Sequence, residues 1–315
     1  MGQDKGMIRS FSDIDRIASE GGPKKLAVLA PEDEEFMNAI KQCTLKGMVE
    51  PVLIGNRERM ERVADAVEFD IGSIVTIFEE DRQTIANRGT ALCFSGDVDI
   101  ACKGQIPTAY VYRSIIRENA RAGGSRTISV ISLWEIPALN RLIALTDTGV
   151  NIRPDGAAKV QIVRSAVSFF HLFGYPKPRI AALTGKRGID GSLASCRDVT
   201  ALREQAAAGG LGACEILEES SFSEIFLGKR GSFFSFDDAL LERLPDILLI
   251  PHLDTGNILV KLDFFLNVIR RSLVMTVKGP VIIPSRSDLC DRIMGELALG
   301  VVAAERIQGG MPDDG

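Results

Sequence analysis

The 315-residue sequence contains only two histidines, one tryptophan and three tyrosines. Because His171 and His252 are the two histidines, a Ser-His-Asp hydrolase or a histidine-rich metal site is poorly supported. The cysteines include no Cys-x-x-Cys pair, a spacing that favours reduced core thiols over a disulfide framework or a zinc site. The six cysteines are Cys43, Cys93, Cys102, Cys196, Cys214 and Cys290.

Long apolar runs and basic tracts are absent as well. No apolar run approaches the roughly 18 residues of a membrane-spanning helix. Around Asp4, Lys5 and Arg9 the N-terminus lacks the apolar core of a signal peptide. The net charge is −5, and no cluster of basic residues alternates with aromatic ones. Nucleic acids and membranes are therefore poor candidate partners, and we expect a cytoplasmic protein.

Apolar runs of strand length alternate with longer amphipathic segments along the chain. Strands are predicted at 25–30, 51–55, 74–78, 98–102, 142–145 and 179–184, and helices at 32–46, 57–66, 81–93, 154–173 and 197–208. This alternation predicts an α/β fold with a parallel, doubly wound sheet. At 315 residues the chain exceeds what one core usually serves, so two domains with a cleft between them are expected.

Two strand-turn-helix units lie in a row near the C-terminus. In the first, a strand at 247–250 ends at Pro251, and Gly256-Asn257 opens a helix with Lys261 one turn inside it. Residues at helical spacing predict the buried face of this helix: Ile258, Leu262, Phe265 and Ile269.

In the second unit a strand at 281–283 ends at Pro284, and Arg286 lies in the turn that follows. Ser285 and Asp288 have the spacing of a capping box at the start of a helix. The apolar face of that helix is predicted to comprise Leu289, Ile293, Leu297 and Val301.

A basic residue beside a helix N-terminus suits phosphate, because the free N–H groups and the helix dipole attract anions. Lys261 and Arg286 both have this placement, so the two turns predict a site for one phosphorylated ligand or for a pair of anions. The same residues also fit a plainer interpretation, in which Ser285 and Asp288 only cap a helix and both basic side chains are solvated.

These two turns resemble the phosphate acetyl/butyryltransferase family. Residues 251–261 are similar to its Pro-x-Leu-x-x-Gly-Asn-x-x-x-Lys segment, and 285–288 to its Ser-Arg-x-Asp turn, in the same order near the C-terminus. Upstream, Lys103-Gly104-x-x-x-Thr108 resembles a turn of the butyryl-type members. Residues 147–154 resemble an Asp-x-x-x-Asn-x-x-Pro turn, matched by Asp147, Asn151 and Pro154.

The resemblance implies two three-layer α/β/α domains with a cleft between them, an architecture like that of isocitrate and isopropylmalate dehydrogenases. The first domain would comprise residues 1–148 and 284–315, and the second residues 149–283. A homodimer is implied in the same way. One cleft would be lined by the predicted substrate-binding residues Lys103, Gly104, Thr108, Asp147, Asn151, Asp254, Gly256, Asn257 and Lys261, together with Ser285 and Arg286.

The implied reaction moves a butyryl or acetyl group between coenzyme A and orthophosphate, with no metal and no bound cofactor. A thiolate attacks an acyl phosphate, which requires a base, oxyanion donors and a cation that holds the departing phosphate. Arg286 fits the phosphate clamp, and Ser285 or its backbone N–H groups fit the oxyanion site. Acetyl-type members have an aspartate where Arg292 lies here, so either Asp288 or Asp291 is the candidate base.

Departures from the family keep other functions open. Butyryl-type members have a Glu-x-Val-Asn-Pro-like turn where this chain has Gly185–Ser192, and an Asp-Gly-Pro-Leu motif is absent between 214 and 226. A non-catalytic protein that binds acyl phosphate or coenzyme A is therefore one alternative. A dehydrogenase of the same fold is another, although it would need metal-binding residues and a nucleotide loop that the sequence does not offer. An acyltransferase that makes fatty-acyl phosphates is a third, with the same reaction type and a longer acyl chain.

Overall fold

The computed structural model describes residues 6–123, 127–136, 141–186, 193–227, 244–266 and 268–309. The chain divides into two compact units by its internal contacts. The first unit includes Phe11–Ser125 and Arg271–Gly310, and the second includes Met1–Ser10 and Arg126–Arg270. These borders differ from the predicted ones at residues 148 and 284.

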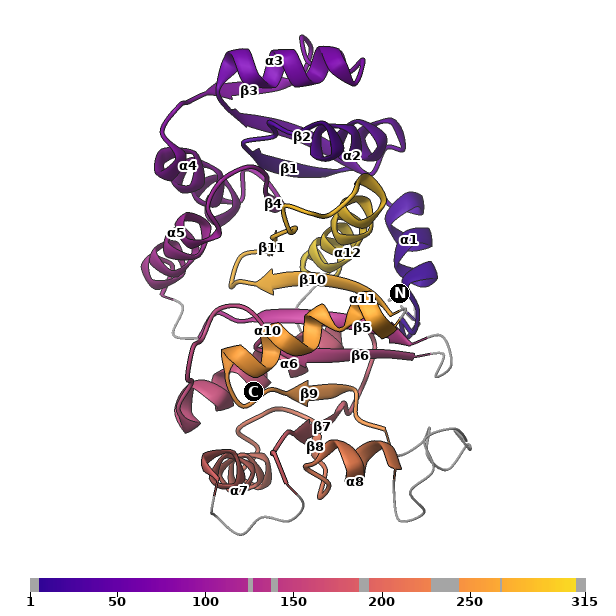
Figure 1. Cartoon of the computed structure of the whole chain (residues 1–315), viewed down its shortest axis with the longest axis vertical. Coiled ribbons are helices and arrows are strands. Elements are labelled where there is room, and N and C mark those ends of the chain that lie inside the picture. Colours follow the sequence, from indigo (N-terminus) through magenta and orange to yellow (C-terminus); the bar gives the residue numbers. More distant parts are fainter. Residues whose placement is uncertain are drawn as a thin grey trace. The chain divides into compact units, whose positions relative to one another are not determined.

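The first unit is an α/β sheet in the order β3-β2-β1-β4-β11-β10 (Figure 1). Neighbouring strands are parallel except for β10 and β11. Its strands are β1 (Lys24–Leu29), β2 (Val49–Gly55), β3 (Val75–Phe78), β4 (Ile100–Lys103), β11 (Pro280–Ile282) and β10 (Ile269–Met275), which begins just before the border. Its helices are α1 (Phe11–Glu20), α2 (Glu34–Leu45), α3 (Arg57–Ala66), α4 (Arg82–Ser95), α5 (Thr108–Arg121) and α12 (Cys290–Gln308).

The order of these strands creates one edge where ligands commonly bind. From β1 the chain proceeds to β2 and β3 on one side, while β4 and β11 lie on the other. In open α/β sheets, ligands bind at the carboxyl ends of the strands beside such a reversal. The turns after β1, β4 and β11 lie at this edge, because these three strands are parallel.

Helix α12 forms the core of the first unit. Leu297, Leu299, Val301 and Val302 are fully buried, and the helix packs against α1, α2 and β11. Its apolar residues occur on nearly every side, as expected for a helix covered all round. The strand-turn-helix unit at 280–308 is therefore an interior element, and the turn between β11 and α12 is held by a rigid scaffold.

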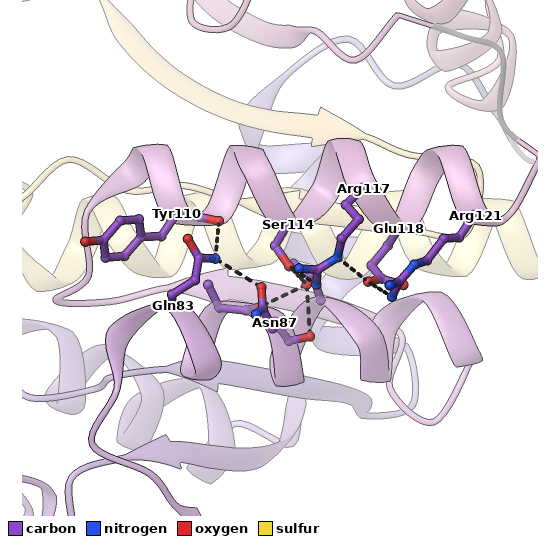
Figure 2. A network of polar contacts seen from close by, with 9 residues as sticks. Gln83, Asn87, Tyr110, Ser114, Arg117, Glu118 and Arg121 are labelled. Carbon is purple, nitrogen blue, oxygen red and sulfur yellow. Dashed lines mark hydrogen bonds and ion pairs between the residues drawn. The ribbon is translucent and has the colours of Figure 1, made fainter.

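A polar network joins α4 to α5 (Figure 2). The Gln83 side chain donates to the Asn87 side chain at 3.0 Å and to the Tyr110 carbonyl at 3.3 Å. Further along α5, Glu118 accepts from Arg117 and Arg121, each at 3.0 Å. This network supports α5, the helix that begins with Thr108.

The second unit has its strands in the order β5-β6-β9-β7-β8. β5 is antiparallel to β6, and the other neighbours are parallel. The strands are β5 (Val130–Ile136), β6 (Arg141–Thr146), β7 (Arg179–Ala182), β8 (Glu215–Ile216) and β9 (Ile247–Leu249). The helices are α6 (Gly156–Leu172), α7 (Ala194–Ala207), α8 (Phe222–Leu227), α10 (Leu253–Lys261) and α11 (Asp263–Leu266).

The structure confirms the predicted α/β class and corrects several elements. Residues 130–136 form a strand that was not predicted, and Ile269 lies in strand β10 rather than in a helix. Both strands have an antiparallel neighbour, so the sheet is mixed and not purely parallel. The helix predicted from Pro154 begins at Gly156, because the Asp155 side chain accepts from the Ala158 N–H at 2.8 Å and caps it.

The largest error concerns the helix predicted after Gly256-Asn257. It begins earlier, at Leu253, with His252 as its N-cap, and it ends at Lys261. Its predicted buried face lies at the surface, with exposed fractions of 64% for Ile258 and 86% for Phe265. Leu289, predicted to lie on the apolar face of the last helix, is likewise exposed. In each case the spacing of apolar residues identified an apolar helix face. Spacing does not show whether another part of the chain packs against that face.

Among the helices of the described residues, none combines the length and the apolar character needed to cross a bilayer. All six cysteines are free thiols, and four of them are buried. Burial raises the pKa of Cys43 and of Cys93 to about 12, which fits inert core thiols.

Candidate active site

The turn after β4 packs directly on the turn after β1. The Gly104 N–H donates to the Leu29 carbonyl at 2.7 Å, and the Gln105 N–H donates to the Ala30 carbonyl at 2.8 Å. A Cβ atom on Gly104 would lie 2.3 Å from the Ala30 carbonyl oxygen. Only glycine permits this approach, so the family-like Lys-Gly pair has a packing reason here. Thr108, half-buried, begins α5 after the turn.

Lys103, the last residue of β4, is buried and is bonded to two backbone carbonyls. Its Nζ donates to the Gly104 carbonyl at 3.1 Å and to the Pro284 carbonyl at 3.2 Å. Burial holds the pKa of Lys103 below its ordinary value, and the positive charge of Arg286 lowers it further. Lys103 thus joins the turn after β4 to the turn after β11.

Ser285 and Asp288 form a turn and do not cap α12. The Ser285 N–H donates to the Asp288 Oδ2 at 2.7 Å, and the Asp288 N–H donates to the Ser285 carbonyl at 3.2 Å. Asp288 is buried and also accepts from Arg292 at 3.5 Å. Arg286 is exposed, and no residue of the described ranges forms a hydrogen bond or ion pair with its guanidinium. The predicted capping box is therefore only half formed, and α12 begins later, after Leu289.

A side chain from another helix occupies the N-terminus of α12. The Cys290 N–H donates to the Glu35 Oε2 of α2 at 2.8 Å. A carboxylate satisfies a free N–H and complements the helix dipole there. The N-terminus of α12 is thus already paired with an anion, and what remains for a ligand is the Ser285–Arg286 turn itself. The sequence alone did not predict that Glu35 caps α12, and its only related signal is the pair of acidic residues in the first turn of α2.

Replacement of Glu35 by alanine is expected to destabilise the protein by about 1 kcal/mol, because the Cys290 N–H loses its acceptor. Thermal unfolding measures the effect. Glu34→Ala is the matched control, since Glu34 lies in the same helical turn and forms no such bond among the described residues. Equal melting temperatures of the two variants would contradict the capping role of Glu35.

The structure separates the two candidate bases. Asp288 is part of the Ser285 turn, whereas Asp291 is exposed and lines a cavity of about 220 Å³. That cavity also includes Asp15 of α1 and Arg271 of β10, which form an ion pair at 2.6 Å. Asp288 is therefore the aspartate joined to the Ser285–Arg286 turn.

In the second unit, Asp147 organises the turn after β6. The Asp147 carboxylate is buried and accepts several hydrogen bonds, and the Asn151 side chain also donates to the Ile128 carbonyl at 2.9 Å. Both residues hold the turn together through these bonds. Donors to Asp147 are the N–H groups of Val130 at 2.9 Å, Gly149 at 3.0 Å, Val150 at 3.2 Å and Asn151 at 2.6 Å, and the Asn151 Nδ2 at 2.6 Å.

Helix α10 packs closely on this turn. A Cβ atom on Gly256 would lie 2.8 Å from the Asp147 carbonyl oxygen, so glycine is needed for the approach. Asn257 is half-buried, and Asp254 and Lys261 are exposed. Within the described residues these three side chains form no hydrogen bond or ion pair, which leaves them available to a ligand.

The predicted site residues therefore form two groups. Asp147, Asn151, Asp254, Gly256, Asn257 and Lys261 belong to the second unit, and Lys103, Gly104, Thr108, Ser285, Arg286, Asp288 and Asp291 to the first. That both groups line one cleft stays a prediction. Of the divergent segment 185–192, residues 187–192 lie outside the described residues. No group of three or more His, Cys, Asp or Glu side chains suited to a metal ion occurs in the described part of the chain.

Comparisons with known proteins identify a family for the chain. The family described as "Phosphate acetyl/butaryl transferase" matches residues 77–301. Phosphate butyryltransferase of Clostridium acetobutylicum is 24% identical over 299 residues, covering 95% of this chain and 99% of that protein.

Two solved structures share the fold. A phosphotransacetylase from Streptococcus pyogenes aligns with a TM-score of 0.75 at 17% identity, over 95% of this chain and 99% of that one. A 4-hydroxythreonine-4-phosphate dehydrogenase from Klebsiella pneumoniae aligns with a TM-score of 0.56 at 12% identity, over 89% of this chain and all 100% of the other. Since the fold alone is common to both activities, the sequence match decides: this chain belongs to the phosphate acetyl/butyryltransferase family of acyltransferase enzymes.

Proposed function

We propose that the protein transfers a short acyl group, butyryl or acetyl, between coenzyme A and orthophosphate. The observation that carries the proposal is the Ser285–Arg286 turn. The Arg286 guanidinium is exposed and has no partner among the described residues, and buried Lys103 donates to the Pro284 carbonyl directly before the turn. A planar guanidinium binds phosphate oxygens through two parallel hydrogen bonds. Membership of the family supplies the reaction class.

The residues of the first unit take the following roles in the proposal. Arg286 holds the phosphoryl group, and the Ser285 hydroxyl or its backbone N–H groups meet the oxyanion. The thiol of coenzyme A needs a proton acceptor. We assign this role to Asp288 in preference to Asp291, because Asp288 is bonded to the turn.

The second unit supplies substrate contacts in the proposal. Asn257 and Lys261 are polar, accessible and placed on one helix by Gly256. Asp147 and Asn151 act through the shape of their turn, since their polar atoms already bond within it. The reaction needs neither a metal nor a bound cofactor, and it suits a cytoplasmic enzyme with small-molecule substrates.

An assay of coenzyme A release from acetyl-, butyryl- and longer acyl-coenzyme A, with and without phosphate, tests the proposal. Phosphate-dependent release from a short acyl-coenzyme A is the expected result. Binding of coenzyme A or acyl phosphate without turnover would favour a non-catalytic family member. Release only from long chains would reassign the acyl substrate.

We also propose a homodimer, supported by an exposed apolar surface on α10, α11 and the start of β10. Its members are Ile258, Leu262, Phe265, Leu266 and Ile269, with exposed fractions of 64%, 36%, 86%, 56% and 52%. Clustered apolar side chains at a surface mark an interaction site more often than scattered ones do. A second copy of the chain is the proposed partner.

The double variant Ile258→Asp/Phe265→Asp is expected to halve the mass seen by light scattering, because two charges would be buried in the dimer. Leu45→Asp is the control, since Leu45 is 70% exposed but belongs to the first unit. A monomeric wild type, or a dimer that survives both substitutions, would contradict the proposed surface.

A further inference from the structure

Lys103 lies level with the ends of two neighbouring strands. It pairs in register with Leu29 of β1, and on its other side Cys102 pairs with Ile282 of β11. The side chain is only 3% exposed. A lysine at a sheet edge normally extends its ammonium into water, so this burial requires a specific set of partners.

The partners are backbone carbonyls of the two turns. One bond stays in the turn of Lys103 itself, and the other crosses 181 residues of sequence to the Pro284 carbonyl at 3.2 Å. Pro284 directly precedes Ser285, whose N–H is held by Asp288 at 2.7 Å. Two side chains therefore hold the Pro284–Ser285 peptide, Lys103 through its carbonyl and Asp288 through its N–H, while the side chains of Ser285 and Arg286 stay exposed.

An ammonium has three N–H donors, and only two are used among the described residues. The third has no acceptor among the described residues. Burial is the largest cause that lowers the pKa of Lys103, and the positive charge of Arg286 lowers it as well. The carboxylates of Glu296 in α12 and Asp288 in the turn raise it. Cys102, the neighbouring residue of the same strand, is a buried thiol whose own pKa is well above its ordinary value, so it adds no charge near neutral pH.

We propose that Lys103 is a positioning residue for an oxyanion at Arg286, fixing the turn through the Pro284 carbonyl and placing a second, buried positive charge behind the anion. The ligand class is a tetrahedral oxyanion, which is phosphate in the proposed reaction. This inference rests on the proposed function only for the identity of that anion. By linkage, protonation of Lys103 strengthens anion binding and a bound anion raises the pKa of Lys103.

Calorimetric titration with sulfate tests the charge without any need for turnover. Lys103→Met, which keeps the length of the side chain but cannot donate, is expected to bind sulfate at least about tenfold more weakly than the wild type. Lys41→Met is the matched control, because the Lys41 Nζ also donates to a backbone carbonyl, that of Val67, at 2.7 Å in the same unit. The control should lose stability without losing sulfate affinity.

The dependence on pH separates charge from packing. Sulfate keeps its charge above neutral pH, so the wild-type affinity should fall as the pH rises and Lys103 deprotonates, at a pH below the ordinary lysine pKa of about 10.4. Lys103→Arg stays charged throughout and should lose this dependence, and it remains informative if the methionine variant fails to fold. Equal sulfate affinity of Lys103→Met and the wild type, or the same pH dependence in Lys103→Arg, would overturn the inference.

Failure of the inference can be told apart from failure of the proposed function. Wild-type turnover combined with unchanged phosphate KM and sulfate affinity in Lys103→Met removes the role of Lys103 alone. No turnover, combined with sulfate binding that Lys103→Met weakens, removes the reaction and retains the anion site. A wild type that neither turns over nor binds sulfate overturns both.

Discussion

Arg286→Ala is expected to lower phosphate-dependent turnover of butyryl-coenzyme A by on the order of a hundredfold or more, roughly 2.7 kcal/mol of transition-state stabilisation. The reason is geometric. The guanidinium is exposed and unpaired within the described residues, and it is attached to a turn that Lys103 and Asp288 hold in place. Stability should stay within about 0.5 kcal/mol of the wild type, because no bond of the fold is lost.

Arg286→Lys separates charge from shape, since an ammonium keeps the charge but lacks the planar fork, and it should restore activity only in part. Arg16→Ala serves as the control. That arginine is 58% exposed on α1 and bonds only to Glu20 within the described residues, so its removal should leave turnover unchanged. Undiminished turnover in Arg286→Ala, with melting temperatures confirming a folded protein, would exclude Arg286 from the mechanism.

Gly104→Ala is expected to destabilise the first unit by roughly 3 to 5 kcal/mol, lowering its melting temperature by roughly 10 °C. The added Cβ atom would meet two backbone oxygens, that of Ala30 at 2.3 Å and that of Leu29 at 2.8 Å. Backbone oxygens at the end of a buried strand cannot move aside as a flexible side chain can. The hydrogen bonds that hold the turns after β1 and β4 together would therefore be strained or broken.

Gly22→Ala is the matched control for this prediction, because a Cβ atom there meets nothing within 4 Å. Its melting temperature should be close to that of the wild type or slightly higher. Calorimetry on both variants decides the matter. Equal melting temperatures of Gly104→Ala and Gly22→Ala would contradict the prediction. They would mean that the turns after β1 and β4 can move apart with little loss of stability.

Much of the fold was predictable because it depends on neighbours in sequence. The helix predicted at residues 57–66 has those bounds, and the strand predicted at 25–30 is shifted by one residue, to Lys24–Leu29. The helix predicted at 32–46 begins two residues later, at Glu34, because the Asp33 side chain accepts from the Phe36 N–H at 3.1 Å and caps it. The α/β class follows from such elements in alternation.

The sequence predicted which turns form the candidate site, but not the hydrogen bonds that its side chains make. The sequence placed Lys103 and Arg286 after strands, yet it contained no sign that the lysine would be buried against Pro284. Asp147 and Asn151 looked like ligand contacts, whereas the structure uses their polar atoms inside the turn. Hydrogen bonds between residues 181 positions apart depend on strand order, which local patterns do not encode.

By itself, the sequence determined many of the strands and helices, the polar turns at their ends and the resemblance to the acyltransferase family, because backbone propensity, apolar period and motif spacing are local properties. The tertiary structure alone decided that Glu35 caps α12, that the stripe from Ile258 to Ile269 faces outward, and that Arg286 is left unpaired within the described residues. Burial and pairing are properties of the packed chain, since they depend on which distant segment arrives beside each residue.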